Sequence, residues 1–512
     1  MFSALRHSLR LLAMARILAR HGVQLPPGQG ALLSKALGLF ARKAAAASRP
    51  GERLAAALFE LGPSFIKLGQ ALSVRSDLIG EELALDLGRL RDRLPPFPAA
   101  AARAAIAAEL GQPVEDLFQD FDNRPVAAAS IAQVHFAVTT EGREVAVKVL
   151  RPGVEAAFRR DLELLFWLAG WAERLLPRWR RLRPVKVVET LAQSVAQEMD
   201  LRLEAAAAVE LASNFKGDPD FRVPEVDWQR TGRRVLTLSR VHGIPIDDRE
   251  ALKAAGHDLR KLAERILRVF LSQALRDGMF HADLHQGNLF VAPDGAIEAV
   301  DFGIVGRLDR PTRQFMAEML LAFLSGDYRR AAEVHFTAGY VPESRSVEAF
   351  AQALRSVGEP ILGHPVNKIS IGRLLAHLFQ VTETFAMQTQ PQLLLLQKTM
   401  VVAEGVAREL DPEINFWTAS RPVIEKWMSE NLNPEARLRD AATNLGEVMQ
   451  GLPALLSTVR QAAGLIGDSG IRLDPEGLRM LADAQASGRR PLTLAAWLIA
   501  GTLAALLLLR AL

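Results

Sequence analysis

The chain has 512 residues, of which 49% are apolar and 23% are charged, and its formal net charge is +4. This length allows two or three compact units, and this composition excludes an intrinsically disordered chain. The absence of cysteine excludes disulfides, thiolate zinc sites, thiolate-ligated iron–sulfur clusters and cysteine nucleophiles.

The first 51 residues are basic and contain no acidic residue. Their eight Lys or Arg side chains suit an anionic membrane surface or an organelle transit peptide. On a helical wheel, apolar side chains share the face on which the first four arginines fall, so a plain solvated helix is almost as good an interpretation. No aromatic interleaving or nucleic-acid motif accompanies these charges, and we expect no nucleic-acid partner.

Residues 52–117 have helical patterns, interrupted by the breaker LPPFP. Two β-type runs, IAQVHFAV and REVAVKVL, then fall within 118–150 and are joined by Thr-Thr-Glu-Gly, which predicts a hairpin. Helical patterns follow at about 153–176 and 185–213, before a strand in RRVLTLSRV. From about 258 the pattern is helical, apart from two short strands around the Pro-Asp-Gly of NLFVAPDGAIEAVDFG. The order predicts a small α/β unit followed by a larger, mainly helical one.

The apolar run LTLAAWLIAGTLAALLLL, residues 492–509, carries no charged side chain. As a helix it would span about 27 Å, close to the hydrocarbon thickness of about 30 Å. Arg489 and Arg490 precede it, and positive charge on that side predicts a cytoplasmic body. We therefore expect a membrane anchor over 489–512 in the bacterial inner membrane. The mitochondrial inner membrane is a less favoured alternative, and a buried core helix is the other interpretation of the run.

Five residues that suit phosphoryl transfer occur in a fixed order along the chain. Asp283 and Asn288 lie five apart in HADLHQGNLF, and Asp301 of Asp-Phe-Gly follows after a predicted hairpin. Upstream, Lys148 lies in a predicted strand and Glu204 in a later predicted helix. This is the order of a protein-kinase-like phosphotransferase.

Each group has a chemical task in such a site. Lys148 would reach the α- and β-phosphates of ATP while Glu204 holds its ammonium group. Asn288 and Asp301 would supply hard oxygen ligands for Mg²⁺. Asp283 would accept a proton or orient the nucleophile. The set predicts ATP and Mg²⁺ as cofactors, with Asp283 and Lys148 as the catalytic residues.

The same string allows a second site. His281, Asp283 and His285 alternate along the chain, and two histidines and a carboxylate could hold a metal ion. The complete kinase-like order favours structural or positioning roles for both histidines instead.

The nucleotide loop departs from the G-x-G-x-x-G-x-V pattern of protein kinases. In the register that ends at Val134, alanine replaces glycine at positions 127, 129 and 132. Because alanine disfavours positive φ, we expect a stiffer loop and altered nucleotide placement. The candidate nucleotide-binding residues are Ala127, Ala128, Ala129, Ser130, Val134, Lys148 and Glu204.

Four further strings carry a family resemblance: FIKLGQALSVRSDLI, the AAAS at 127–130, QEMDLRLEA and KTMVVAEGVARELDP. With the kinase-like set, they resemble the UbiB family of atypical kinases over roughly residues 50–415. Lys67 and Gln70 match the family motif K-x-G-Q, and Glu198 and Asp200 match E-x-D. The resemblance implies that the K-x-G-Q helices cover the site where a protein kinase would bind its peptide.

The carboxylates of the E-x-D region cannot all address one lysine. Asp200 and Glu204 are four apart and share a helix face, whereas Glu198 lies about 120° from Glu204. Glu198 and Asp200 therefore stay available for Lys67 or for a metal ion.

The expected fold is α+β: a protein-kinase-like bilobal fold with an added N-terminal helical extension and a C-terminal transmembrane helix. The expected domains are a basic arm (1–51), a helical extension with K-x-G-Q (52–117), an N-lobe with a helical insertion (118–242), a helical C-lobe (243–475) and the anchor (489–512).

The resemblance implies a membrane-associated ATPase or kinase that supports ubiquinone biosynthesis, by ATP-driven handling of a prenylated phenolic precursor for ring hydroxylation. Expected partners are membrane lipids, that precursor and other quinone-biosynthesis enzymes. Two alternatives stay open: a nucleotide-binding scaffold without turnover, and a conventional protein kinase. No A-P-E motif or long activation segment follows Asp-Phe-Gly, which disfavours the protein kinase.

Overall fold

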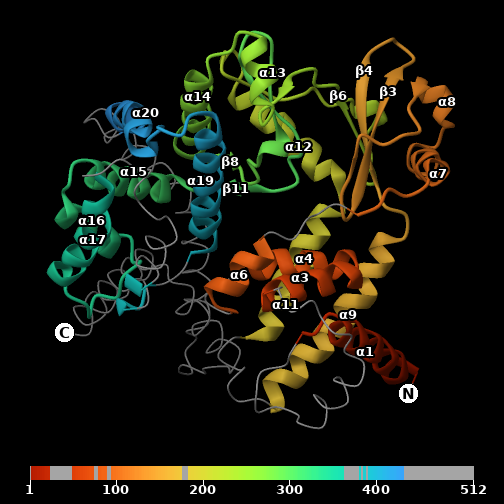
Figure 1. Ribbon diagram of the computed structural model, residues 1–512, viewed down its shortest axis with the longest axis horizontal. Helices are drawn as coiled ribbons and strands as arrows, with labels where there is room; N and C mark the ends of the chain where they lie inside the picture. The colour runs from red at the N-terminus through yellow and green to blue at the C-terminus, as the bar shows by residue number, and fades with distance from the viewer. Residues whose placement is uncertain are drawn as a thin grey trace, which may run out of the picture. The chain divides into compact units, whose positions relative to one another are not determined.

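The computed structural model describes residues 2–23, 49–73, 79–88, 94–175, 183–362, 380–381, 384–387 and 390–431 (Figure 1). The chain divides into two compact units, Met1–Ser429 and Glu430–Leu512, and the elements below belong to the first, apart from the last two residues of α20. No helix among the described residues is both long and apolar enough to span a membrane. The predicted anchor over 489–512 lies outside the described residues.

A five-stranded antiparallel sheet forms the centre of the N-lobe. Its order is β1-β3-β4-β6, with β2 paired to β3. The strands are β1 (Phe118–Phe121), β2 (Ala127–Ala128), β3 (Ala132–Thr139), β4 (Glu144–Leu150) and β6 (Val235–Ser239). Val145, Val147 and Val149 alternate along β4 and are buried, as expected for a strand with one face against a core. The predicted hairpin is confirmed, with Gly142 supplying positive φ in its turn.

Two short helices cover the buried valines of this sheet. They are α7 (Ala99–Leu110) and α8 (Val114–Leu117). Ile106 of α7 packs in one apolar cluster with Val145 and Val147, and it is fully buried. The N-lobe sheet is therefore fixed from the side opposite Lys148, whose side chain points to the other face.

A second group of helices packs around α9 (Val154–Leu175) and α11 (Pro184–Glu198). It contains α1 (Phe2–Arg20), α3 (Pro50–Leu61), α4 (Pro63–Ser73) and α6 (Glu81–Gly88), which Figure 1 shows together in red and orange. Phe65 and Ile66 of α4 are buried against Leu164 of α9 and Val188 of α11. This packing positions the K-x-G-Q segment.

The helix predicted over 185–213 is in fact two helices. α11 ends at Glu198, and α12 (Leu201–Asn214) starts after two intervening residues. Asp200 has extended backbone and its side chain accepts from the backbone N–H of Arg202, which makes it an N-cap. The cap breaks the helix because an N-cap residue cannot keep helical φ and ψ.

The C-lobe is mainly helical and carries two small sheets, ordered β5-β10-β9-β7 and β11-β8. Its strands are β5 (Phe221–Arg222), β7 (Ile244–Pro245), β8 (Met279–His281), β9 (Leu289–Val291), β10 (Ile297–Ala299) and β11 (Val305–Arg307). The two strands predicted around Pro-Asp-Gly are confirmed as the antiparallel pair β9 and β10.

The helical elements from η1 onward complete the described fold. They are η1 (Trp228–Arg230), α13 (Arg249–Ala254), α14 (Leu259–Leu271), the π-helical segment η2 (Ser272–Asp277), η3 (Gln286–Asn288), α15 (Arg310–Leu324), α16 (Tyr328–Thr337), α17 (Val347–Leu362), α19 (Pro391–Leu410) and α20 (Phe416–Asn431). α14 packs along α19, and residues from both helices share the largest apolar cluster with β8 and β9. The strands that carry the candidate site residues are thus held against a rigid helical layer.

Candidate active site

Lys148 lies at the centre of an ion-pair cluster in which Lys148 and Glu204 are mostly buried and the side chain of Asp301 is 47% exposed. Its Nζ donates to Oε1 and Oε2 of Glu204 at 2.8 and 2.9 Å, and to Oδ1 of Asp301 at 2.8 Å. β4 provides the lysine, α12 the glutamate, and the segment after β10 the aspartate. The predicted pairing of Lys148 with Glu204 is therefore present, and Asp301 joins it from the C-lobe.

Burial and charge act in opposite directions on these three groups. Burial lowers the pKa of Lys148, but Asp301 and Glu204 outweigh it and hold that pKa well above its usual value. Burial raises the pKa of Glu204 to about 7 even though Lys148 opposes the shift. Burial would also raise the pKa of Asp301, yet Lys148 and, more weakly, His281 and Lys67 hold it well below the usual range. At neutral pH, Lys148 is therefore protonated, Asp301 is ionised, and Glu204 is close to its pKa.

The backbone at Asp301 is strained. Its φ is 62°, in the left-handed region that disfavours a side chain with a Cβ, and such a residue costs of order 1–3 kcal/mol. The following Gly303 leaves room beside the carboxylates, because a Cβ there would lie 3.3 Å from Oδ1 of Asp301. The backbone strain and the ion pair with Lys148 together fix the direction of the Asp301 carboxylate.

Asp283 and Asn288 lie on the turn between β8 and β9. The amide Nδ2 of Asn288 donates to the carbonyl oxygen of Asp283 at 3.1 Å, so that the amide oxygen is directed elsewhere. Asn288 is only 6% exposed, whereas the side chain of Asp283 is 37% exposed. The turn thus combines a fixed amide oxygen on Asn288, which could bind a metal ion, with an accessible carboxylate on Asp283.

The structure assigns positioning roles to the two histidines of the turn. His281 is buried, its Nδ1 accepts from the backbone N–H of Asp283 at 3.1 Å, and its Nε2 lies 3.0 Å from the carbonyl oxygen of Val300. Both ring nitrogens are therefore engaged, and burial lowers the pKa of this ring, which keeps it neutral. Nδ1 of His285 accepts from the backbone N–H of Gly287 at 3.0 Å. Within the described part of the chain, no group of three His, Cys, Asp or Glu side chains is arranged around a metal position.

Two residues that the sequence did not single out fix the backbone of this turn. Oε1 of Gln273, in the π-helical segment η2, accepts from the backbone N–H of His281 at 2.9 Å. Oγ1 of Thr399, in α19, lies 3.3 Å from the carbonyl oxygen of Ala282 and 2.8 Å from that of Leu395 in its own helix. A π-helical turn lies directly before β8, and such turns often occur at functional sites. The apolar periodicity of the sequence does not reveal this turn.

The alanine loop forms a short closed hairpin. Ala127 pairs with Val134 and Ala128 with Gln133, and the N–H of Ala129 donates to the carbonyl oxygen of Ala132 at 2.8 Å. Val134 lies in turn opposite Lys148 on β4, which places the hairpin beside the ion-pair cluster. None of the hairpin residues has positive φ, so alanine fits this backbone where the glycines of a protein kinase would allow other conformations.

Arg151 and Gln133 attach this hairpin to the LPPFP segment, and the sequence did not reveal either role. The guanidinium of Arg151 donates to the carbonyl oxygens of Ala129 at 3.1 Å and Pro95 at 3.0 Å, and it lies 5.3 Å from the ring centroid of Phe97. Gln133 is buried and exchanges two hydrogen bonds with the backbone of Phe97. These contacts stiffen the hairpin beyond the effect of alanine.

Lys67 of the K-x-G-Q motif forms an ion pair with Glu198 of the E-x-D motif. Nζ of Lys67 is 2.6 Å from Oε2 of Glu198, and each side chain is 11% exposed. Lys67 is near enough to the cluster to lower the pKa of Asp301. Gln70 follows one turn later on α4, where it is half-buried and its carbonyl oxygen accepts from Ser73.

The prediction that Asp200 is available to Lys67 or a metal ion is wrong. Its carboxylate caps α12 and also forms an ion pair with the guanidinium of Arg202 at 2.6 Å. Because Asp200 is the N-cap of α12 and has extended backbone, the assumption of one continuous helix through Asp200 and Glu204 does not hold.

The side chains present fit Mg²⁺. Asn288 and Asp301 offer an amide oxygen and a carboxylate, which are hard donors of the kind that this ion prefers. Mg²⁺ usually takes one or two protein carboxylates or carbonyls and completes its shell with phosphate oxygens and water. Asn288 and Asp301 would hold the ion, which would neutralise charge on the phosphates.

Two family models match separate parts of the chain. Residues 89–335 match the family model described as ABC1 atypical kinase-like domain, and residues 354–415 match the UbiB helical domain. A Probable protein kinase UbiB from Marinobacter nauticus is 43% identical over 424 residues, covering 82% of this chain and 78% of its own length. The chain belongs to the UbiB family. A UbiB relative from Aeromonas salmonicida is 42% identical over 467 residues, with 88% of this chain and 85% of its own length covered.

A solved structure agrees with this assignment. The Rv3197–erythromycin complex from Mycobacterium tuberculosis has a TM-score of 0.51 and 26% identity, and the match covers 71% of this chain and 93% of that one. Membership of the UbiB family confirms the predicted resemblance and the kinase-like α+β fold, and it implies a role in ubiquinone biosynthesis.

Proposed function

We propose that this UbiB family member binds ATP with Mg²⁺ and uses it, as an ATPase or kinase, to handle a prenylated phenolic lipid during ubiquinone biosynthesis. The observation that carries the proposal is the cluster of Lys148, Glu204 and Asp301 beside the turn that bears Asp283 and Asn288. A scaffold without turnover does not require an accessible carboxylate at position 283.

The roles proposed for the residues follow from their contacts. Lys148 holds the α- and β-phosphates and is kept charged and oriented by Glu204. Asn288 and Asp301 bind the metal ion, and Asp283 accepts the proton of the attacking hydroxyl or water. The hairpin of Ala127, Ala128, Ala129 and Ser130, with Val134 on β3, covers the nucleotide.

The proposed acceptor is small or lipidic and is not a protein. Only residues 304–309 separate Asp-Phe-Gly from α15, and β11 within them pairs with β8. This leaves no long segment to hold a peptide. The ion pair of Lys67 with Glu198 places α4 near Asp301, which supports a cleft partly covered by the K-x-G-Q helix.

We further propose that the protein works at the bacterial inner membrane with its catalytic body in the cytoplasm, anchored by residues 489–512. Membrane lipids and the quinone precursor are the proposed partners, with other quinone-biosynthesis enzymes as further ones. The basic residues of the N-terminal arm and the apolar run at 492–509 support this placement.

The deciding experiment measures ATP hydrolysis by the purified full chain, with and without anionic liposomes and a phenolic quinone precursor. Asp301→Asn should lower the rate by at least about a hundredfold, the loss typical of removing one group that stabilises transition-state charge. The matched control is Asp294→Asn, because Asp294 is an exposed aspartate of the β9–β10 hairpin that pairs with Arg222; it should leave the rate unchanged.

Three results would contradict the proposal in different ways. Normal hydrolysis by Asp301→Asn would refute the metal assignment. Nucleotide binding by the wild type without any turnover would favour the scaffold. Rapid phosphorylation of added proteins would favour a conventional protein kinase and refute the covered cleft.

A further inference from the structure

The outer face of α9 carries aromatic side chains that the core does not use. Phe166, Trp167 and Trp171 are 36%, 37% and 47% exposed. The rings of Trp167 and Trp171 lie 5.8 Å apart, and their positions differ by about 40° around the helix, so they share one face. The rest of the helix surface includes buried residues, which are Phe158, Asp161, Leu164, Leu165 and Ala169. The solvated face of an amphipathic helix is normally polar, so these exposed tryptophans need another explanation.

The chain that follows these tryptophans is strongly basic. Residues 174–186 contain six Lys or Arg and no acidic residue. The described ones, Arg174 at the end of α9 and Arg183 and Lys186 at the start of α11, are all exposed. Positive charge is thus concentrated where the exposed aromatic stripe ends.

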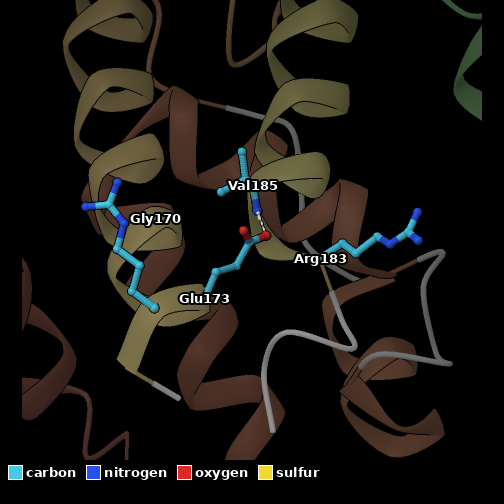
Figure 2. Close-up of a pocket in the computed structure, with 5 residues that line it drawn as sticks. Gly170, Glu173, Arg183 and Val185 are labelled. Atoms are coloured by element: carbon cyan, nitrogen blue, oxygen red, sulfur yellow. Dashed lines mark hydrogen bonds between the residues drawn. The ribbon is translucent and has the colours of Figure 1, made fainter. Parts of the chain in front are cut away.

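Nearby acidic groups only partly offset this charge. Glu173 accepts from the backbone N–H of Val185 at 3.1 Å, which commits it to the first turn of α11, as Figure 2 shows. Glu189 pairs with Lys186 at 3.2 Å, and Glu163 is exposed on the same side of α9 as Trp167. Residues 163–189 of the sequence contain six basic and three acidic side chains, so this part of the chain has a net positive charge.

The two arginines border a cavity between the helices. It has a volume of about 500 Å³ and is lined by Gly170, Glu173, Arg174, Arg183 and Val185 (Figure 2). Gly170 lies between the two tryptophans in sequence and exposes backbone instead of a side chain. An opening of this kind beside guanidinium groups suits a phosphate, because arginine binds phosphate oxygens through two parallel N–H donors.

We propose that Phe166, Trp167, Trp171, Arg174, Arg183 and Lys186 form a docking surface for an anionic lipid bilayer, here called the tryptophan–arginine surface. Tryptophan is enriched at membrane–water interfaces, and each basic residue near an anionic bilayer adds about 1 kcal/mol of attraction. This proposal rests on the membrane location proposed above, and it adds a second membrane contact that is separate from the predicted anchor at 489–512. The same helix α9 packs against α4, which carries Lys67, so docking through this surface would bring the K-x-G-Q helix close to the lipid.

Because the chain has no cysteine, a single introduced cysteine reports on one position. Trp171→Cys in the full chain is labelled with a fluorophore that shifts to the blue on leaving water, and the protein is reconstituted in neutral phosphatidylcholine or in vesicles that also contain phosphatidylglycerol. The label should shift to the blue and resist an aqueous quencher only with phosphatidylglycerol. The matched control is Trp228→Cys, because Trp228 is 52% exposed in η1 of the N-lobe, and it should respond to neither lipid.

Charge reversal tests the arginines in the same labelled protein. Arg174→Glu with Arg183→Glu should lower the ratio of lipid-buried to water-exposed label at least about tenfold, from the loss of two basic residues at about 1 kcal/mol each. Arg124→Glu with Arg345→Glu, two exposed arginines elsewhere, changes the net charge equally and should leave the ratio unchanged.

Several outcomes would overturn the docking surface: a label at position 171 that stays aqueous with phosphatidylglycerol, one that responds equally to neutral lipid, or equal effects of the two charge reversals. ATP hydrolysis is measured on the same samples. A normal lipid response without hydrolysis would contradict the proposed function and leave the docking surface intact.

Discussion

At the scale of single residues, Glu204 links the ion-pair cluster to pH. Burial raises the pKa of its carboxyl to about 7, against the attraction of Lys148. Its charge therefore changes within the physiological range, while Asp301 stays ionised because Lys148 holds its pKa well below the usual value. The orientation of Lys148 depends on a carboxylate that is half protonated near neutrality.

We predict that kcat/KM for ATP hydrolysis falls as the pH drops through about 7, because Glu204 gains a proton and Lys148 loses one of its two anionic partners. A pH profile of kcat/KM reports the free enzyme and checks this directly. Glu204→Gln should lower the plateau and flatten this acid limb. Glu210→Gln, on the same helix but paired with the exposed Arg307, should keep it. An acid limb that persists in Glu204→Gln would assign the titration to another group.

The effect of Glu204 on folding has the opposite sign. Its pKa is higher in the folded protein than its ordinary value of 4.5, so the folded state binds the proton more tightly between pH 4.5 and about 7. The stability that this proton provides is complete below pH 4.5 and is lost as the pH rises through 7. A fall in activity on acidification therefore does not come from unfolding through Glu204.

At the scale of elements, the alanine hairpin and the LPPFP segment act together. The hairpin is closed by its own backbone hydrogen bonds, and Arg151 and Gln133 attach it to Pro95 and Phe97. All of its residues have negative φ, so glycine there would add conformational freedom without relieving strain. The rigidity of this element comes from both its sequence and its attachment.

Ala127→Gly should lower the free energy of unfolding by about 0.5–1 kcal/mol and change nucleotide affinity, because glycine in a strand loses more conformational entropy than alanine. Denaturant unfolding and calorimetric nucleotide titration measure the two effects. Ala137→Gly makes the same change on β3 of the same sheet, at a position opposite Val145 that packs in the apolar cluster on the face away from Lys148. It should destabilise the fold similarly and leave nucleotide affinity alone. Equal effects of both variants on affinity would mean that the hairpin does not contact the nucleotide.

At the scale of the whole molecule, the N-terminal helix is tied to the helices that position the site. The buried Asp161 of α9 accepts from Oγ of Ser64 in α4 at 2.8 Å and from the guanidinium of Arg10 in α1 at 3.2 Å. Glu60 of α3 pairs with Arg20 and His21 at the other end of α1. Helix α1 therefore does more than supply positive charge, because it packs against α3 and contacts α9.

Arg10→Ala should lower the free energy of unfolding by about 1–3 kcal/mol, because the buried carboxylate of Asp161 then loses its ion-pair partner. Arg16→Ala is the matched control, since Arg16 is exposed on the same helix, and it should change stability by less than about 0.5 kcal/mol. Thermal and denaturant unfolding of the full chain measure both variants. Equal losses would show that the contact of Arg10 with Asp161 adds no stability beyond that of an exposed arginine on α1.

The sequence by itself determined the β-hairpin around Gly142, the paired strands β9 and β10, and the order of Lys148, Glu204, Asp283, Asn288 and Asp301. These features depend on short-range patterns: alternation of apolar residues, turn residues, and motif spacing that the chemistry of phosphate and metal binding constrains. The family resemblance followed from the same strings, and the comparisons confirm it.

Only the tertiary structure decided which side chains meet. Lys67 reaches Glu198 across more than a hundred residues, while Asp200, two residues on, turns to cap α12. Thr399 approaches the turn at His281 from a helix more than a hundred residues away in sequence, and Gln273 holds it from the π-helical segment just before β8. The physical reason is that a helix break or a cap rotates every following side chain, and the energies that decide these breaks come from packing and hydrogen bonds between distant segments, which local spacing does not encode.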